Sequence, residues 1–154
     1  MTDNYKKVEA MLYNYKENKA YAKNLKKDLE ELKREGFEGI SALGQEERTG
    51  QTYKITSSVE NEVIRREKEI ELLEKKIRSL EVDVKKVDNI LPVLSDMELK
   101  LVTMKYFKKM KHKDIAKELG YVEAYITQQR SKIIDRLKEL IWYYYALDWG
   151  LMYE

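Results

Sequence analysis

The sequence contains no cysteine, one proline and six glycines in 154 residues, and no apolar run approaches the ~18 residues that a membrane span requires. Without cysteine the chain can form neither disulfides nor thiolate zinc sites. His112 is the single histidine, and no glycine-rich phosphate loop follows a predicted strand. The polar start from Thr2 to Lys7 does not form a signal peptide. We therefore expect a cytoplasmic protein that is not an enzyme, with no metal, cofactor or membrane association.

Charged residues make up 38% of the sequence, with balanced signs and a net charge of +2. This composition and the near absence of proline favour long helices, so the expected fold class is all-α. Residues 93–140 hold 11 basic and 7 acidic residues, residues 141–154 are net negative by two, and residues 1–92 are neutral. The basic excess is confined to one segment, which gives weak support for a nucleic-acid partner there.

Two heptad stripes dominate residues 1–92. The first covers about residues 5–35, with apolar positions at Val8, Met11, Tyr15, Ala22, Leu25, Leu29 and Leu32. The second covers residues 59–91, where Arg66 is the only polar residue in the stripe and Ser57 or Ser58 is the expected N-cap. Between them, residues 36–58 contain four glycines and no periodicity, which predicts a long loop. The sequence therefore predicts a long antiparallel helical hairpin, or coiled coil, with pairing between two protomers as the alternative.

A second domain is predicted over residues 93–140. Pro92 disfavours helix at the residue before it, and Ser95 followed by Glu98 forms a capping-box pattern that starts a new helix. A short helix follows over residues 114–119, and Gly120 supplies the left-handed backbone that ends it. A third helix begins near Glu123. This pattern predicts a three-helix helix-turn-helix domain that binds double-stranded DNA.

The third helix has an apolar face and a polar face. Ile126, Ile133 or Ile134, and Leu137 are expected in the core. The polar side chains can bond base edges or phosphates, and Lys111 and Lys113 precede the short second helix. The candidate DNA-binding residues are Lys111, Lys113, Glu123, Tyr125, Thr127, Gln128, Arg130, Ser131 and Lys132.

The residues from Leu101 to Phe107, followed by Asp114 to Tyr121, resemble sigma-factor region 4, where an apolar helix ending in Tyr-Phe precedes Ile-Ala-x-x-Leu-Gly. Over more of its length the chain resembles phage sigma-like late transcription regulators of the ArpU and RinA type. The resemblance implies activation of phage or prophage late genes through promoter DNA, with contact to RNA polymerase. Val122 and Ala124 depart from the family pattern, because Val122 cannot cap the helix with its side chain and Ala124 cannot hydrogen-bond a base.

Residues 141–154 form an aromatic C-terminal tail that includes Trp142 and Trp149. Two interpretations stand: the tail folds back onto the domain, or it forms an interface for a homodimer or for polymerase. Two other functions compete with transcription regulation. One is the small-terminase DNA-recognition subunit of a phage, and the other is a coiled-coil interaction protein that does not bind DNA.

Overall fold

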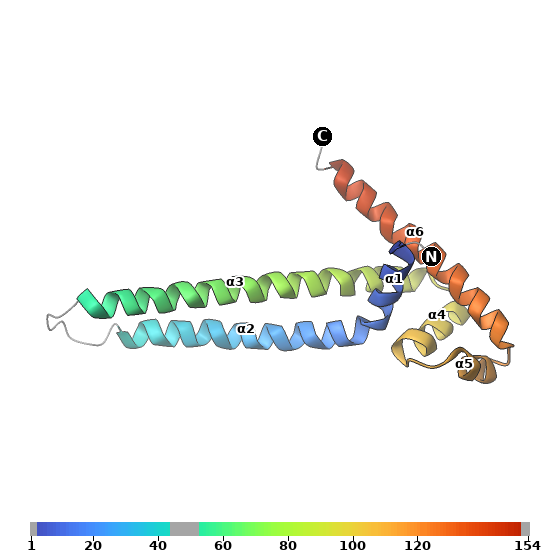
Figure 1. Ribbon diagram of the computed structural model, residues 1–154, viewed down its shortest axis with the longest axis horizontal. Helices are drawn as coiled ribbons and strands as arrows, with labels where there is room; N and C mark the ends of the chain where they lie inside the picture. The colour runs from blue at the N-terminus through green and yellow to red at the C-terminus, as the bar shows by residue number, and fades with distance from the viewer. Residues whose placement is uncertain (1–2, 44–52, 152–154) are drawn as a thin grey trace. The chain divides into compact units, whose positions relative to one another are not determined.

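The computed structural model describes the backbone of residues 3–43 and 53–151, and the side chains of residues 3–36 and 58–142. Every regular element in these ranges is helical, which confirms the all-α class (Figure 1). The elements in order are α1 (Asp3–Tyr13), α2 (Tyr15–Leu43), α3 (Tyr53–Ile90), the 3₁₀ turn η1 (Leu91–Val93), α4 (Asp96–Val102), the π-helical η2 (Thr103–Phe107), α5 (His112–Leu119) and α6 (Glu123–Leu151). None of the helices in the described ranges is long and apolar enough to cross a membrane.

The chain divides into two units, and the division differs from the sequence-based boundaries. Unit 2 is Lys19–Glu81, whereas unit 1 combines Met1–Asn18 with Val82–Glu154. The first 18 residues therefore belong with the C-terminal part of the chain. The heptad stripe of residues 5–35 does not show this, because the backbone changes helix at Asn14 while the apolar spacing continues.

In unit 2, α2 and α3 lie side by side and run in opposite directions (Figure 1). Ion pairs join Lys26 to Glu81 and Lys33 to Glu74, so a later residue of α2 pairs with an earlier residue of α3, as in an antiparallel pair. The stripe residues Ala22, Leu25 and Ile77 are buried between the helices. Lys76 lies over the ring of Tyr21, 5.1 Å from its centroid.

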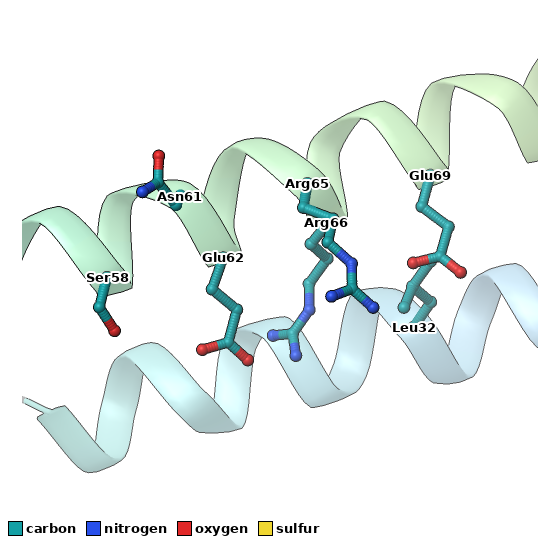
Figure 2. Close-up of a pocket in the computed structure, with 7 residues that line it drawn as sticks. All are labelled: Leu32, Ser58, Asn61, Glu62, Arg65, Arg66 and Glu69. Carbon is teal, nitrogen blue, oxygen red and sulfur yellow. The ribbon is translucent and has the colours of Figure 1, made fainter.

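The polar residue in the α3 stripe is accommodated by a glycine. A Cβ on Gly36 would lie 3.2 Å from Cδ of Arg66, so the long arginine occupies space that a larger residue of α2 would fill. Figure 2 shows Arg66 and Glu62 extending from α3 toward α2 along a groove between the helices. Arg65 and Glu69 also line this groove, so its charges are of both signs.

The helices of unit 2 extend into the segment predicted as a loop. α2 continues to Leu43 and α3 begins at Tyr53, so residues 36–43 and 53–58 of the predicted loop 36–58 are helical, and residues 44–52 lie outside the described residues. Ser57 and Ser58 lie inside α3 rather than at its N-terminus, so the predicted N-cap is wrong. The four glycines of this segment favoured a loop in the prediction, but two of them, Gly36 and Gly39, lie within α2 and do not interrupt it.

Unit 1 has one hydrophobic core, to which both ends of the chain contribute. Val8 and Leu12 of α1 are almost fully buried there, as are Tyr106, Ile126 and Leu137. Among the residues whose side chains are described, the buried members of this core are Tyr5, Val8, Leu12, Val87, Ile90, Leu94, Leu101, Val102, Tyr106, Ile115, Ala116, Ile126, Ile133, Ile134, Leu137 and Ile141. α1 packs on α6 and η2 and thereby becomes a structural part of this domain.

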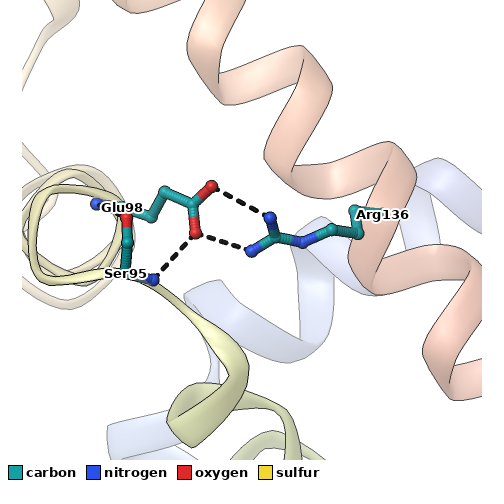
Figure 3. A network of polar contacts seen from close by, with 3 residues as sticks. All are labelled: Ser95, Glu98 and Arg136. Carbon is teal, nitrogen blue, oxygen red and sulfur yellow. Dashed lines mark hydrogen bonds and ion pairs between the residues drawn. The ribbon is translucent and has the colours of Figure 1, made fainter.

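Local signals at the start of α4 behave as predicted. α3 ends at Ile90, and Pro92 lies in the 3₁₀ turn that follows. The Ser95 hydroxyl accepts a hydrogen bond from the Glu98 backbone N–H (3.3 Å), and the Ser95 N–H donates to the Glu98 carboxylate (2.9 Å), which completes a capping box. Arg136 of α6 donates both Nη atoms to the same carboxylate (Figure 3). This network ties the N-terminus of α4 to α6 through side chains 38 residues apart.

The predicted aromatic tail is not a separate element, because its backbone continues α6. α6 continues without a break from Glu123 to Leu151, so the third helix of the domain includes most of residues 141–154. Ile141 is buried in the core, and the Lys7 ammonium lies 5.8 Å from the ring centroid of Trp142. The side chains of residues 143–154 lie outside the described residues, so the predicted roles of the later aromatic residues are not assigned.

Candidate nucleic-acid interface

The join between α5 and α6 defines the candidate surface. Gly120 ends α5 with φ 76° and ψ 31°, a left-handed backbone that a residue with a Cβ adopts at an energetic cost. The Gly120 N–H donates to the carbonyl of Ala116, and the Tyr121 N–H to the same oxygen (2.9 Å). After this tight turn α6 begins at Glu123 and packs its inner face on α5. The turn therefore sets the direction of α6, and the predicted role of Gly120 is confirmed.

The outer face of the first turns of α6 is uncovered. Glu123, Thr127, Gln128 and Lys132 are exposed, whereas Ile126, Ile133, Ile134 and Leu137 are buried on the opposite side. Tyr125 and Ser131 are half-buried, and the Tyr125 ring stacks on Tyr121 at 4.7 Å. Lys111 and Lys113, which flank the first residue of α5, are exposed. Six of the nine sequence-predicted site residues are thus exposed around the start of α6 and α5, and Tyr125, Arg130 and Ser131 are half-buried.

Arg130 departs from the expected orientation. Its side chain is only 18% exposed, and its Nη1 lies 3.6 Å from Oε1 of Glu9 in α1. The Arg130 Nε is buried and has no hydrogen-bond partner among the described residues. Sequence spacing alone placed Arg130 on the polar face, because Glu9 is 121 positions away and gave no local signal. The expectation that Arg130 reaches phosphate or bases is therefore corrected: it pairs with α1.

Glu9 also accepts a hydrogen bond from the Tyr106 hydroxyl (2.7 Å). Tyr106 belongs to η2, where the Lys108 N–H bonds to the Thr103 carbonyl five residues back. Burial raises the pKa of Tyr106, and the hydrogen bond to Glu9 raises it further, so the hydroxyl stays protonated and donates. A single carboxylate of α1 thus holds both Tyr106 and Arg130, which joins α1, η2 and α6 around one partly buried polar centre at the edge of the core.

His112 connects α5 to the exposed face of α6. Its Nδ1 lies 3.0 Å from the Thr127 hydroxyl oxygen, and that hydroxyl donates to the Glu123 carbonyl (3.1 Å). Burial lowers the pKa of His112, and the nearby charges of Lys105 and Arg130 lower it further, which favours the neutral ring. With the hydroxyl proton given to the carbonyl, the consistent tautomer has Nδ1–H donating to Thr127. His112, the first residue of α5, thus holds an α6 side chain in place.

The surroundings of this face are positively charged. Residues 103–132 contain eight lysines and arginines against three acidic residues, a net charge of +5. Besides Lys111, Lys113 and Lys132, the exposed cations include Lys108 and Lys117, which sequence reasoning did not select. Their spacing gave a signal, since Lys117 lies on α5 four residues after Lys113 and shares its side of the helix. Within the described ranges no group of three or more metal-ligating side chains gathers, so no metal centre is assigned.

Comparisons with protein-family models, with curated proteins and with solved structures gave no match to this chain.

Proposed function

We propose that this protein is a sequence-specific DNA-binding transcription regulator in which α4 with η2, α5 and α6 form a helix-turn-helix domain. The observation that carries the proposal is the left-handed turn at Gly120, which joins α5 to a long helix whose first turns are buried on one side and uncovered on the other. A recognition helix needs this arrangement, because its outer face must enter the major groove while its inner face stays in the core. Thr127, Gln128 and Lys132 lie on the outer face.

Charge supports the same interpretation. The net charge of +5 over residues 103–132 is concentrated in lysines, and a lysine can approach phosphates from either strand of a duplex. Six of these lysines are exposed. Lys109 pairs with Glu17, and the other five lie around α5 and the start of α6: Lys108, Lys111, Lys113, Lys117 and Lys132. If all five contact phosphate, binding should weaken by two to three orders of magnitude, roughly, between ~50 and ~200 mM salt.

The similarity to phage sigma-like late regulators extends the proposal. By that similarity the protein acts in the cytoplasm as an activator of phage or prophage late genes, binds promoter DNA and contacts RNA polymerase without catalysing a reaction. The α2–α3 pair of unit 2 would then be the coiled-coil region that such regulators place beside the helix-turn-helix. The Lys26–Glu81 and Lys33–Glu74 pairs within one chain support an intramolecular hairpin over pairing between protomers.

The test is binding of the purified full-length protein to restriction fragments of the DNA that carries its gene, with competitor DNA, at ~50 and ~200 mM salt. We expect selective retention of a promoter-proximal fragment and weaker binding at the higher salt. The double variant Gln128→Ala, Lys132→Ala should lose this selectivity. Its matched control is Asn61→Ala, Lys27→Ala, which removes an amide and one positive charge from exposed positions of unit 2 and should bind like the original protein.

Absence of binding at both salt concentrations would overturn the proposal and direct attention to protein partners. Light scattering on the same sample tests the competing DNA-packaging function, since a large closed ring would favour a small-terminase subunit. A monomer or dimer that binds one fragment selectively supports the regulator.

A further inference from the structure

The exposed face of α6 is poor in charged hydrogen-bond donors. An open depression runs along it, lined by Val122, Glu123, Ala124, Tyr125, Thr127, Gln128 and Ser131. Ala124, Gln128 and Ser131 follow the helical spacing of four and three residues, so they share one line along the helix. Val122 is 71% exposed at the end of this line, just before α6 begins. The lining residues include no lysine or arginine, and Glu123 is the only charged one.

The arginine nearest to this depression does not extend into it. Arg130 is the only cationic residue between Glu123 and Ser131, and its guanidinium pairs with Glu9 of α1 instead of extending outward. A guanidinium is the usual partner of guanine, because it donates two parallel hydrogen bonds to the O6 and N7 acceptors. With Arg130 held by Glu9, the middle of the α6 face has no group of this kind.

Thr127 and Gln128 differ in what their polar groups already bind. The Thr127 hydroxyl donates to the Glu123 carbonyl and lies against Nδ1 of His112, so its bonds are made within the protein. The Gln128 amide is exposed, and in the described part of the chain it has no hydrogen-bond partner. An amide offers one donor and one acceptor side by side, which matches the N7 acceptor and the N6 donor of adenine.

We infer that α6 recognises A·T base pairs in the major groove, with Gln128 bonded to adenine and the small apolar side chains of Ala124 and Val122 against thymine methyl groups. The inference rests on the proposed DNA-binding function and names the bases that this face would select. Glu123 disfavours guanine at its own position, because a carboxylate repels the two acceptors of guanine and accepts from an amino group, either N4 of cytosine or N6 of adenine. The apolar residues that depart from the sigma pattern thus gain a role as methyl contacts.

The test is selection of bound duplexes from a pool with a randomised central segment, using the full-length protein. We expect enriched sites with at least two adjacent A·T pairs. Gln128→Ala should lower the preference at one of them about 5- to 100-fold. Gln128→Arg should change the base selected at that position to guanine. The matched control is Gln129→Ala, the same change on the next residue, which does not line the depression and should select the same site as the original protein.

Each result has a defined meaning. A selected site whose Gln128-dependent position is G·C overturns the inference, as does an unchanged site for Gln128→Ala. Salt-dependent binding without any enriched sequence also overturns it, while the broader proposal of DNA binding stands. Absence of binding to every duplex at ~50 mM salt overturns both. Because Gln128 is exposed, circular dichroism should give the same helical signal for its variants as for the original chain.

Discussion

Glu98 combines several interactions in one carboxylate. It accepts from the Ser95 backbone N–H at the start of α4 and from both Nη atoms of Arg136 in α6 (Figure 3). Burial by itself raises the pKa of Glu98, but the hydrogen bonds from Arg136 and Ser95 outweigh it, and the net shift is a lowering. The ionised form is therefore the one that the folded domain stabilises.

This shift predicts a pH-dependent contribution to stability. Since the pKa of Glu98 is lower in the folded chain than its ordinary value of 4.5, the stabilisation is fully present above about 4.5 and is lost as the pH falls through the folded value. Glu98→Gln keeps the capping geometry but removes the charge, so we expect a loss of about 1 kcal/mol at pH 7 and a smaller loss near pH 3. Urea unfolding at both pH values measures it, with exposed Glu118→Gln as control. An equal loss at both pH values would contradict the prediction.

The same residues show what sequence can and cannot reveal at this scale. Ser95, Glu98 and Gly120 could be assigned because a cap or a left-handed turn depends on neighbours within a few positions. The orientation of Arg130 could not, because it depends on Glu9 at the other end of the chain. Likewise the partner of His112 is Thr127, which only the folding of α5 onto α6 brings near.

At the scale of elements, α1 is the main departure from the sequence-based prediction. Its apolar residues continue the heptad spacing of α2, so the two helices were predicted as one. Periodicity identifies which face of a helix is buried but not which surface covers it. In the structure the face of α1 meets α6 and η2, whereas that of α2 meets α3. The π-helical η2 was also missed, since one extra residue in a turn leaves no clear pattern in apolar spacing.

The variant Leu12→Ala tests whether α1 is part of the domain. Its side chain is fully buried, and Leu12→Ala removes apolar contacts and leaves a cavity, which costs about 2–5 kcal/mol in the free energy of unfolding. The matched control is Leu72→Ala on α3, where the side chain is 68% exposed and the expected change is within about 0.5 kcal/mol. Chemical denaturation followed by circular dichroism gives both values. Similar small losses in the two variants would mean that α1 is not docked as described.

At the scale of the whole molecule, one folding unit is assembled from the two ends of the chain. Every residue of the large core cluster lies in residues 1–18 or 82–154, and none comes from Lys19–Glu81. Six of its buried members lie outside the residues 93–140 that the sequence predicted as a domain: Tyr5, Val8, Leu12, Val87, Ile90 and Ile141. A chain limited to residues 93–140 would expose the apolar groups that those six residues cover.

We therefore predict different outcomes for two shortened chains. Replacing residues 19–81 with a short Gly/Ser linker should leave a folded protein that unfolds cooperatively and keeps the DNA selectivity of the full chain, because the core cluster is intact. Residues 93–140 alone should give no cooperative thermal transition, because part of the core is missing. Circular dichroism during heating compares the two. If the linker variant fails to fold while residues 93–140 fold alone, then α1 and the end of α3 are not integral to the domain, and the boundaries inferred from sequence would be the better description.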